Sequence, residues 1–274
     1  MTSAAVPAKI NLALVVGATQ ASGLHELASV MQRIDIADRL TIEPAADTAV
    51  FGLDGDTLIR QALESLSAAA GVRTGFHATI EKHIPVAAGL GGGSADAAAA
   101  LSLANALLDR PVSVDVLHEL AVELGSDVPF FLDPGPKLVE GTGQRLRALD
   151  LPQDFYVVLL RPDAISKRAT GDVYRQFDAL GGGTDFGRRR DELLDAIGHC
   201  HRARDLAFLP TNDLAEASGA SGHVEKFQRL GAFRSDVSGA GPCVYGLFTT
   251  RPPAECAAAE LGVIGTVWLT VPVW

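Results

Sequence analysis

The sequence predicts an α+β fold, in which strands and helices follow one another in short units along 274 residues. Two observations support this prediction. Residues 9–16 alternate in the manner of a strand, and five later stretches have the apolar spacing of helices. No repeat with a period of about 20 to 50 residues is present, which excludes solenoids and propellers. Periodicity alone leaves an α/β arrangement open.

The first predicted strand covers residues 9–16. Its apolar face is formed by Ile10, Leu12, Leu14 and Val16, while Lys9 and Asn11 lie on the opposite face. We therefore expect Lys9 and Asn11 to project together, away from the main core. Further strands are predicted at 39–43, 75–81, 155–161, 243–249 and 266–271.

Helices are predicted at 57–70, 94–108, 114–124, 188–201 and 223–230. Gly125 follows the third of these, where a left-handed C-cap is expected. The glycine run 181–183 predicts a surface loop. A change in composition at 149–154 marks the best candidate for a domain boundary.

Composition excludes several classes of function. The chain has 23 Lys and Arg residues against 33 Asp and Glu, a formal charge of −10, and no clustered basic footprint for nucleic acid. No apolar run reaches the roughly 18 residues of a membrane span, and the N-terminus lacks the features of a secretory signal. Three widely spaced cysteines, Cys200, Cys243 and Cys256, favour a reducing compartment. We expect a cytoplasmic protein that binds small molecules.

The strongest local motif is a glycine-rich loop that precedes a helix. Four glycines occur in the five positions 89–93, and glycine lets a ligand approach the backbone closely. Successive N–H groups and the positive end of the next helix then favour an anion, with phosphate as the natural ligand. The residues expected to bind ATP are Pro85, Val86, Ala87, Ala88, Gly89, Leu90, Gly91, Gly92, Gly93, Ser94 and Ala95.

The loop differs from two common nucleotide-binding motifs. It is not a Walker A motif, because no Gly-Lys-Ser/Thr ends it, and Ser94 occupies the third glycine position of a dinucleotide motif. The simplest alternative is a tight turn in which Ser94 caps the helix. Ser94 is also compatible with both roles, as a helix cap whose hydroxyl faces phosphate or a metal ion.

A second glycine motif occurs at residues 238–242, Ser-Gly-Ala-Gly-Pro, before an apolar strand. Taken alone it is typical of a hairpin turn. Together with the first loop, Gly239, Ala240 and Gly241 are expected to form the other wall of a substrate pocket.

These motifs resemble a known family. Pro7-Ala-Lys-Ile-Asn-Leu12, the 89–96 loop and Ser238-Gly-Ala-Gly-Pro-Cys243 are similar, in this order, to the signature motifs of the GHMP kinases, named after galactose, homoserine, mevalonate and phosphomevalonate. Supporting stretches are 24–27, 124–130, 140–143 and Asn212-Asp-Leu214. The resemblance extends from residue 7 to residue 248.

The resemblance implies two lobes, 1–150 and 151–274, with ATP and substrate in the cleft between them. It implies transfer of the γ-phosphoryl group of ATP, with Mg²⁺, to the 2-hydroxyl of 4-diphosphocytidyl-2-C-methyl-D-erythritol, a step of non-mevalonate isoprenoid precursor synthesis. The family's lysine and aspartate at the transfer site correspond to Lys9 and Asp127.

The position of Asp127 suits a general base. It follows the predicted helix 114–124 and precedes Pro129, so the chain displays it at the junction between elements. A carboxylate there can accept a hydroxyl proton, and Lys9 can offset negative charge on the group in transfer. The alternatives are a helix N-cap for Asp127 and an ordinary surface lysine for Lys9.

The chain departs from the family at one position that matters. Leu24 stands where the family has a tyrosine that is expected to stack on cytosine. His25 remains available to hydrogen-bond the pyrimidine edge, and Tyr174 is a candidate stacking face. We expect Asn11, His25 and Tyr174 to bind substrate, and Ser94 is the candidate Mg²⁺ ligand.

Two other functions remain open: a GHMP kinase for another small alcohol such as homoserine or a mevalonate-like compound, and a non-catalytic sensor of ATP and a metabolite. The presence of both Lys9 and Asp127 disfavours the sensor. Small molecules are the only expected partners, of a monomer or homodimer. The trio His199-Cys200-His201 predicts a solvated helix end, since residues two apart point to different sides of a helix.

Overall fold

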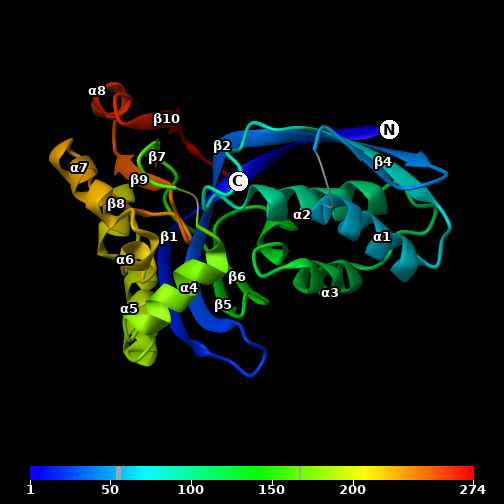
Figure 1. The fold of residues 1–274 in the computed structure, drawn as a ribbon, viewed down its shortest axis with the longest axis horizontal. Coiled ribbons are helices and arrows are strands. Elements are labelled where there is room, and N and C mark those ends of the chain that lie inside the picture. Colours follow the sequence, from blue (N-terminus) through cyan, green and yellow to red (C-terminus); the bar gives the residue numbers. More distant parts are fainter. Residues whose placement is uncertain (54–56, 167) are drawn as a thin grey trace. The chain divides into compact units, whose positions relative to one another are not determined.

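The computed structural model describes residues 1–53, 57–166 and 168–274. It combines helices with two sheets, one of seven strands and one of four, which confirms the predicted α+β class (Figure 1). Strands β4, β5 and β11 pair antiparallel with β2, whereas β3 pairs in parallel with β4. Within the described part of the chain, no helix is both long and apolar enough to cross a membrane.

The chain divides into two compact units, each built from three separate stretches. The first unit comprises 1–8, 36–86 and 91–134, and the second comprises 9–35, 87–90 and 135–274. Strands β1 (Thr2–Thr19) and β2 (His25–Ala45) contribute residues to both units. The division into lobes at residue 150 stays a prediction.

Among the described residues, the first unit contains three α-helices and one end of the seven-stranded sheet. Residues 39–45 of β2 pair with β4 (Gly75–Glu81), which pairs with β3 (Ala49–Phe51). Helices α1 (Leu58–Ala70) and α2 (Gly92–Asn105) lie beside each other under these strands, and α3 (Val114–Leu124) packs on both helices (Figure 1). The alanines of α2 are buried except for Ala99, which is partly buried, and their small side chains allow close packing of the helices. The short helix η1 (Pro129–Phe131) follows α3.

The second unit contains the four-stranded antiparallel sheet, in the order β10-β7-β9-β8. Its strands are β7 (Tyr156–Pro162), β8 (Arg234–Val237), β9 (Val244–Phe248) and β10 (Gly265–Thr270). Helices α7 (Val224–Arg229) and α8 (Arg251–Leu261) pack against it. All five residues of β9 are buried, as expected for an interior strand of a covered sheet.

Besides its parts of β1 and β2, the described residues of the second unit include three further strands and five further helices outside this four-stranded sheet. Strands β5 (Lys137–Gly141) and β6 (Arg145–Ala148) extend the pairing of β2, and β11 (Pro272–Val273) pairs with residues 33–34 of β2. The helices are α4 (Thr170–Ala179), α5 (Phe186–Gly198), η2 (Ala203–Phe208), α6 (Ala215–Ser218) and η3 (Ser221–His223).

All six predicted strands and all five predicted helices are present, β4 and α3 with the predicted ends and the others with shifted ends, and the glycines 181–183 lie in a turn as predicted. One predicted cap is wrong. Gly125 has φ 159° and ψ 158°, which is not the left-handed conformation, although its N–H still bonds Ala121 C=O at 3.2 Å. The next residues leave α3 in an extended direction and then turn toward η1, so no left-handed residue is required.

Candidate active site

Helix α2 begins differently from its two neighbours in the first unit. The hydroxyls of Thr57 and Ser113 accept backbone N–H groups at the starts of α1 and α3. Helix α2 begins at Gly91 (φ 70°), and no side chain caps it. Its first α-helical hydrogen bond joins Ala95 N–H to Gly91 C=O at 2.9 Å, so the three preceding amides have no partner within the helix. Such an end attracts an anion.

The expectation that Ser94 caps this helix is wrong. Gly92 and Gly93 are already helical, so α2 starts two residues earlier than predicted and Ser94 lies in its first turn. The reason is that Gly91 adopts the left-handed conformation and reverses the chain, which a residue with a side chain does at a cost of about 1–2 kcal/mol. The amide and hydroxyl of Ser94 both belong to the helix N-terminus.

The loop before α2 is held in an unusual conformation. Gly89 and Gly91 have positive φ angles, and Ala87 (φ 49°) is the non-glycine residue with a positive φ in the described backbone. Strained residues of this kind persist only where neighbouring contacts fix them, and they are concentrated at functional sites. Val86 is 68% exposed and Gly93 is also exposed, whereas Ala88 and Leu90 are buried.

In the second unit, the centre of this loop lies against the second glycine motif. Ser238 Oγ donates to Gly89 C=O at 2.8 Å, and Cys243 N–H donates to Ala88 C=O at 3.2 Å. A Cβ atom on Gly89 would lie 2.1 Å from Ser238 O, and one on Gly239 would lie 3.2 Å from Gly89 O. The two motifs, about half the chain apart in sequence, are therefore in backbone contact that only glycine permits.

Strand β1 brings the N-terminal motif to the same place. Lys9 N–H donates to Leu90 C=O at 2.9 Å, and the Asn11 Oδ1 atom lies 3.5 Å from the position of a Cβ on Gly239. The three motifs that carried the family resemblance thus meet in the second unit. Cys243 is not a nucleophile there, because burial raises the pKa of its thiol to about 12.

Lys9 and Asn11 are buried, with exposures of 3% and 1%, so the expectation that they project away from the core is wrong. The physical reason is that their face continues with apolar Ala13 and Val15, and both faces of β1 are covered from Ala8 to Val16. The alternative of an ordinary surface lysine is wrong for the same reason.

A chain of hydrogen bonds fixes these two side chains. Lys9 Nζ donates to Asn11 Oδ1 at 2.6 Å, and Asn11 Nδ2 donates to Ser29 Oγ at 2.8 Å. Ser29 Oγ in turn donates to Ala13 C=O at 2.6 Å, and Tyr245 OH donates to Asn11 C=O at 3.0 Å. The ammonium of Lys9 is therefore oriented by a buried polar network, and such networks define one geometry when fully satisfied.

Asn212 is a site residue whose role the sequence analysis missed. Its Nδ2 donates to Val237 C=O at 2.8 Å and to Gly239 C=O at 2.7 Å, and its N–H donates to Asp236 Oδ2 at 2.9 Å. Burial raises the pKa of Asp236, while the charge of Arg234 opposes this shift. Asn212 thus fixes the second glycine motif through hydrogen bonds to backbone carbonyl groups within it and directly before it. The Asn212-Asp-Leu214 stretch supported the family resemblance, but these residue types alone do not indicate a role in the site.

His25 and Tyr174 lie together, on β2 and α4. Their ring centroids are 4.7 Å apart with an angle of 32° between the planes. His25 Nε2 lies 2.7 Å from Asp178 Oδ1 and 3.1 Å from Thr19 Oγ1. Because the two rings touch, no base fits between them. Leu24, which precedes His25 in the chain, is 49% exposed.

Asp127 lies in the turn between α3 and η1 in the first unit, half-buried. The alternative in which it caps a helix is wrong, because η1 has Val128 as its N-cap and no side chain caps it. Its turn and the first turn of α2 belong to the same unit, in which α2 contacts η1.

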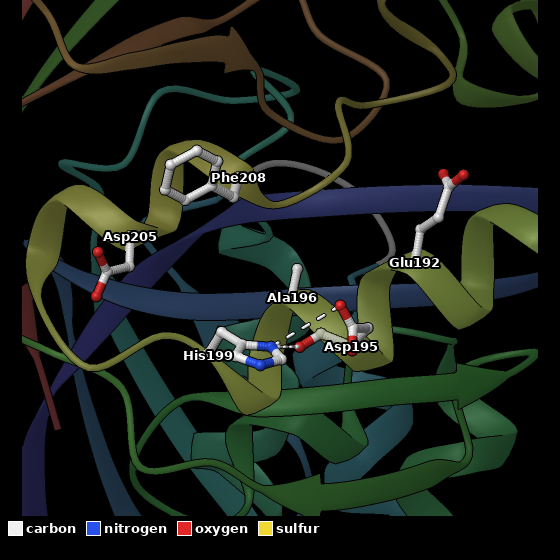
Figure 2. A pocket seen from close by; sticks show the side chains of 6 residues that line it. All are labelled: Glu192, Asp195, Ala196, His199, Asp205 and Phe208. Atoms are coloured by element: carbon white, nitrogen blue, oxygen red, sulfur yellow. Dashed lines mark hydrogen bonds and ion pairs between the residues drawn. The ribbon is translucent and has the colours of Figure 1, made fainter.

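A shallow pocket of about 310 Å³ lies elsewhere in the second unit, on α5 and η2 (Figure 2). His199 is the C-cap of α5, and its Nδ1 lies 2.8 Å from Asp195 O. His199 and His201 are exposed, as predicted for a solvated helix end, but Cys200 between them is buried. The three carboxylates of the lining disfavour a polyphosphate. The lining consists of Glu192, Asp195, Ala196, His199, Asp205 and Phe208.

The fold and these motifs together define a class: α+β proteins in which a glycine-rich loop leads into a helix whose first amides no side chain caps. Comparison with known proteins gives the family. The model of the GHMP kinases N terminal domain matches residues 57–135, and that of the GHMP kinases C terminal matches residues 223–262. The chain belongs to the GHMP kinases and is a small-molecule kinase, for which ATP is the phosphoryl donor.

Relatives within the family narrow the comparison. The chain is 37% identical to a 4-diphosphocytidyl-2-C-methyl-D-erythritol kinase of Streptomyces coelicolor, over 95% of this chain and 92% of the relative. It is 39% identical to the kinase of the same name from Anaeromyxobacter, over 93% and 85%. A crystal structure of 4-(cytidine 5'-diphospho)-2C-methyl-D-erythritol kinase is similar with a TM-score of 0.81 and 31% identity over both whole chains. A mevalonate kinase structure, at 14% identity and a TM-score of 0.76 over 100% of this chain and 99% of that one, shares the fold.

The contact between the glycine motifs predicts an unequal effect of two alanine substitutions. Gly219 has φ 76° with open space around its Cβ position, so Gly219→Ala should lower the free energy of unfolding by only about 1–2 kcal/mol. Gly89 has φ 79°, but a Cβ there collides with Ser238 O, so Gly89→Ala should cost about 4 kcal/mol or more. Chemical denaturation of both variants measures the difference. Equal costs would contradict the close contact.

Proposed function

We propose that this kinase transfers the γ-phosphoryl group of ATP to the 2-hydroxyl of 4-diphosphocytidyl-2-C-methyl-D-erythritol, giving the 2-phosphate and ADP, in non-mevalonate isoprenoid precursor synthesis. The single observation that carries the phosphoryl chemistry is the glycine-capped start of α2, whose amides no side chain caps. The choice of acceptor is supported by relatives of that name at 34–39% identity over most of the chain.

ATP binds through backbone groups of the loop. The triphosphate lies along residues 85–95, where the amides of the first turn of α2 donate to its oxygens. Hydrogen bonds to a charged group contribute about 1.5–3 kcal/mol each, which exceeds the screened repulsion of a surface charge of −10. Gly239, Ala240 and Gly241 are assigned to substrate binding.

Asp127 and Lys9 act on the group in transfer. The 2-hydroxyl oxygen attacks the γ-phosphorus, the bond between this phosphorus and the β,γ-bridging oxygen breaks, and the hydroxyl proton passes to the Asp127 carboxylate. Lys9 offsets the negative charge on the phosphoryl oxygens. Its ammonium is already oriented by Asn11, so little reorganisation is needed during the reaction.

Mg²⁺ is the metal that these residues fit. The oxygens of Ser94 and Asp127 are hard donors, and the described residues hold no group of three or more His, Cys, Asp or Glu side chains that binds a metal without help. This suits an ion bound mainly by the phosphates of its nucleotide. Ser94 would hold it, and when bound it supplies neutralisation of charge on the phosphate oxygens.

The cytidine end of the substrate is assigned to His25 and Tyr174, and Asn11 is assigned to substrate binding next to Lys9. Asp178 holds the His25 ring at 2.7 Å, which leaves Nδ1 for the pyrimidine edge. Tyr174 offers its outer face for stacking, in place of the family tyrosine that Leu24 replaces. The enzyme is proposed to act in the cytoplasm as a monomer or homodimer, on small molecules and not on nucleic acid.

The acceptor is tested by release of ADP from ATP and Mg²⁺ over a panel of alcohols. We expect strong preference for 4-diphosphocytidyl-2-C-methyl-D-erythritol over homoserine and mevalonate. Leu24 is the observation that favours a second candidate, a GHMP kinase for another small alcohol, and preference for such an alcohol would establish that candidate. Binding of ATP without turnover of any acceptor would indicate a sensor instead.

Asp127→Asn tests the general base. The amide cannot accept the hydroxyl proton, so kcat should fall by at least about 100-fold, while the KM for ATP stays nearly unchanged. Asp115→Asn, an equal charge change at an exposed position in α3, is the matched control. Turnover near that of the wild type in Asp127→Asn would remove this residue from the mechanism.

Ser29→Ala tests the orientation of Lys9. The substitution removes the acceptor of Asn11 Nδ2 without touching either substrate, so kcat should fall by about 10-fold through loss of alignment. Ser65→Ala, which removes a hydroxyl that bonds Ala62 C=O on α1, should leave kcat unchanged. Equal kcat values for the two variants would show that the network does not orient Lys9.

A further inference from the structure

A half-buried lysine in the first unit links both ends of the glycine-rich loop. Lys82 lies just after β4, and its Nζ donates to Asp38 Oδ2 and, at 2.7 Å, to Asp96 Oδ2. The side chain of Asp38 is fully buried, that of Asp96 is 2% exposed, and that of Lys82 is 18% exposed. Asp38 belongs to β2 and Asp96 to the second turn of α2, so the lysine joins three elements.

Asp38 fixes the start of the loop. Its Oδ1 accepts the backbone N–H groups of His83 at 2.6 Å and Ile84 at 2.8 Å, directly before Pro85. The other oxygen of the same carboxylate holds Lys82. The first loop residues and the Lys82 ammonium are therefore fixed to one buried group, and the ammonium extends that connection to Asp96, beyond the end of the loop.

The ammonium also lies directly beside the first turn of α2. A Cβ atom on Gly92 would lie 3.4 Å from Lys82 Nζ and 3.0 Å from Ile84 Cγ2. The absence of a side chain at Gly92 thus lets the start of α2 pack against the lysine and against the start of the loop. A substitution at Lys82 acts on the amides of this turn through direct packing.

The charges of the cluster require the lysine. Two carboxylates face one ammonium, and removal of the ammonium leaves two buried anions next to a loop that binds phosphate. Burial raises the pKa of Asp96 to about 6 against the effect of Lys82, and burial opposes, but does not prevent, a raised pKa of Lys82 between Asp38 and Asp96. Loss of one partner of such a buried group is far more disruptive than loss of a surface pair.

We propose that Lys82 is a positioning residue for the phosphoryl donor: by bridging Asp38 and Asp96 it sets the distance between the two ends of the loop and the direction of the first amides of α2. The inference rests on the proposed function in that the loop binds the phosphates of ATP, but it does not depend on which alcohol is the acceptor. Lys82 itself touches neither the acceptor nor the reacting atoms.

Lys82→Met is the direct test, because methionine keeps the length of the side chain and removes the charge. We expect the Kd for ADP and the KM for ATP to rise at least 10-fold, the KM for the acceptor to stay within 2-fold, and kcat at saturating ATP to change by less than 3-fold. Lys82→Arg, which keeps a cation, should recover most of the ADP affinity. Arg60→Met removes a cation of the same unit that bonds Thr48 C=O, and should leave the Kd for ADP unchanged.

A second variant tests the proposal if Lys82→Met does not fold. The double substitution Lys82→Met with Asp96→Asn removes the bridge without leaving two unpaired carboxylates, and its Kd for ADP should also rise at least 10-fold. ADP binding within 2-fold of the wild type in either folded variant would overturn the proposal. Failure of the proposed function is seen separately, in a wild-type protein that binds no ADP or that turns over no acceptor.

Discussion

The start of α2 is the constraint on which the candidate site depends. A helix N-terminus leaves backbone amides without partners, and proteins normally satisfy them with a Ser, Thr, Asp or Asn side chain. Helices α1 and α3 follow this rule, and α2 does not, because Gly91 is its N-cap. No side chain caps these amides, and the glycines of the loop also let other parts of the chain approach it closely.

In the second unit, the middle of the same loop is contacted mainly by backbone atoms of other segments. Gly89 contacts Ser238 and Gly239, Leu90 accepts the amide of Lys9, and Asn212 supports the carbonyl groups below Gly239. Side chains of the site are therefore few, and each is fixed: Lys9 by Asn11, Asn11 by Ser29. Phosphoryl transfer depends mainly on position and charge, and this is what a rigid backbone with a few oriented side chains supplies.

Local sequence patterns predicted most of the fold but not burial. Apolar periodicity located β4 and α3 to the residue, because these elements have one covered face each. The same periodicity placed Lys9 on an exposed face, because Lys9 and Asn11 alternate with apolar residues as in an amphipathic strand. In the structure this part of β1 is covered on both sides. The alternative in which Ser94 caps α2 was wrong, because the helix starts at Gly91 in the left-handed conformation. A run of glycines does not indicate which of them adopts that conformation.

The site was predictable only where one motif holds its own chemistry. The glycine-rich loop could be selected from local sequence, whereas Lys9 and Asp127 were selected through the family resemblance. Lys82 and Asn212 could not be selected, since their roles come from partners far away in sequence, Asp38 on β2 and the carbonyl groups of Val237 and Gly239. Tertiary contacts of this kind leave no periodic or compositional signal.

A crystal structure of the protein with a non-hydrolysable ATP analogue and Mg²⁺ is the most direct measurement of the central claim. The account predicts the β- and γ-phosphates within hydrogen-bond distance of the amides of Gly92, Gly93 and Ser94, with the γ-phosphate facing Asp127. Density for the triphosphate away from the start of α2, with these amides bound only to water, would contradict it.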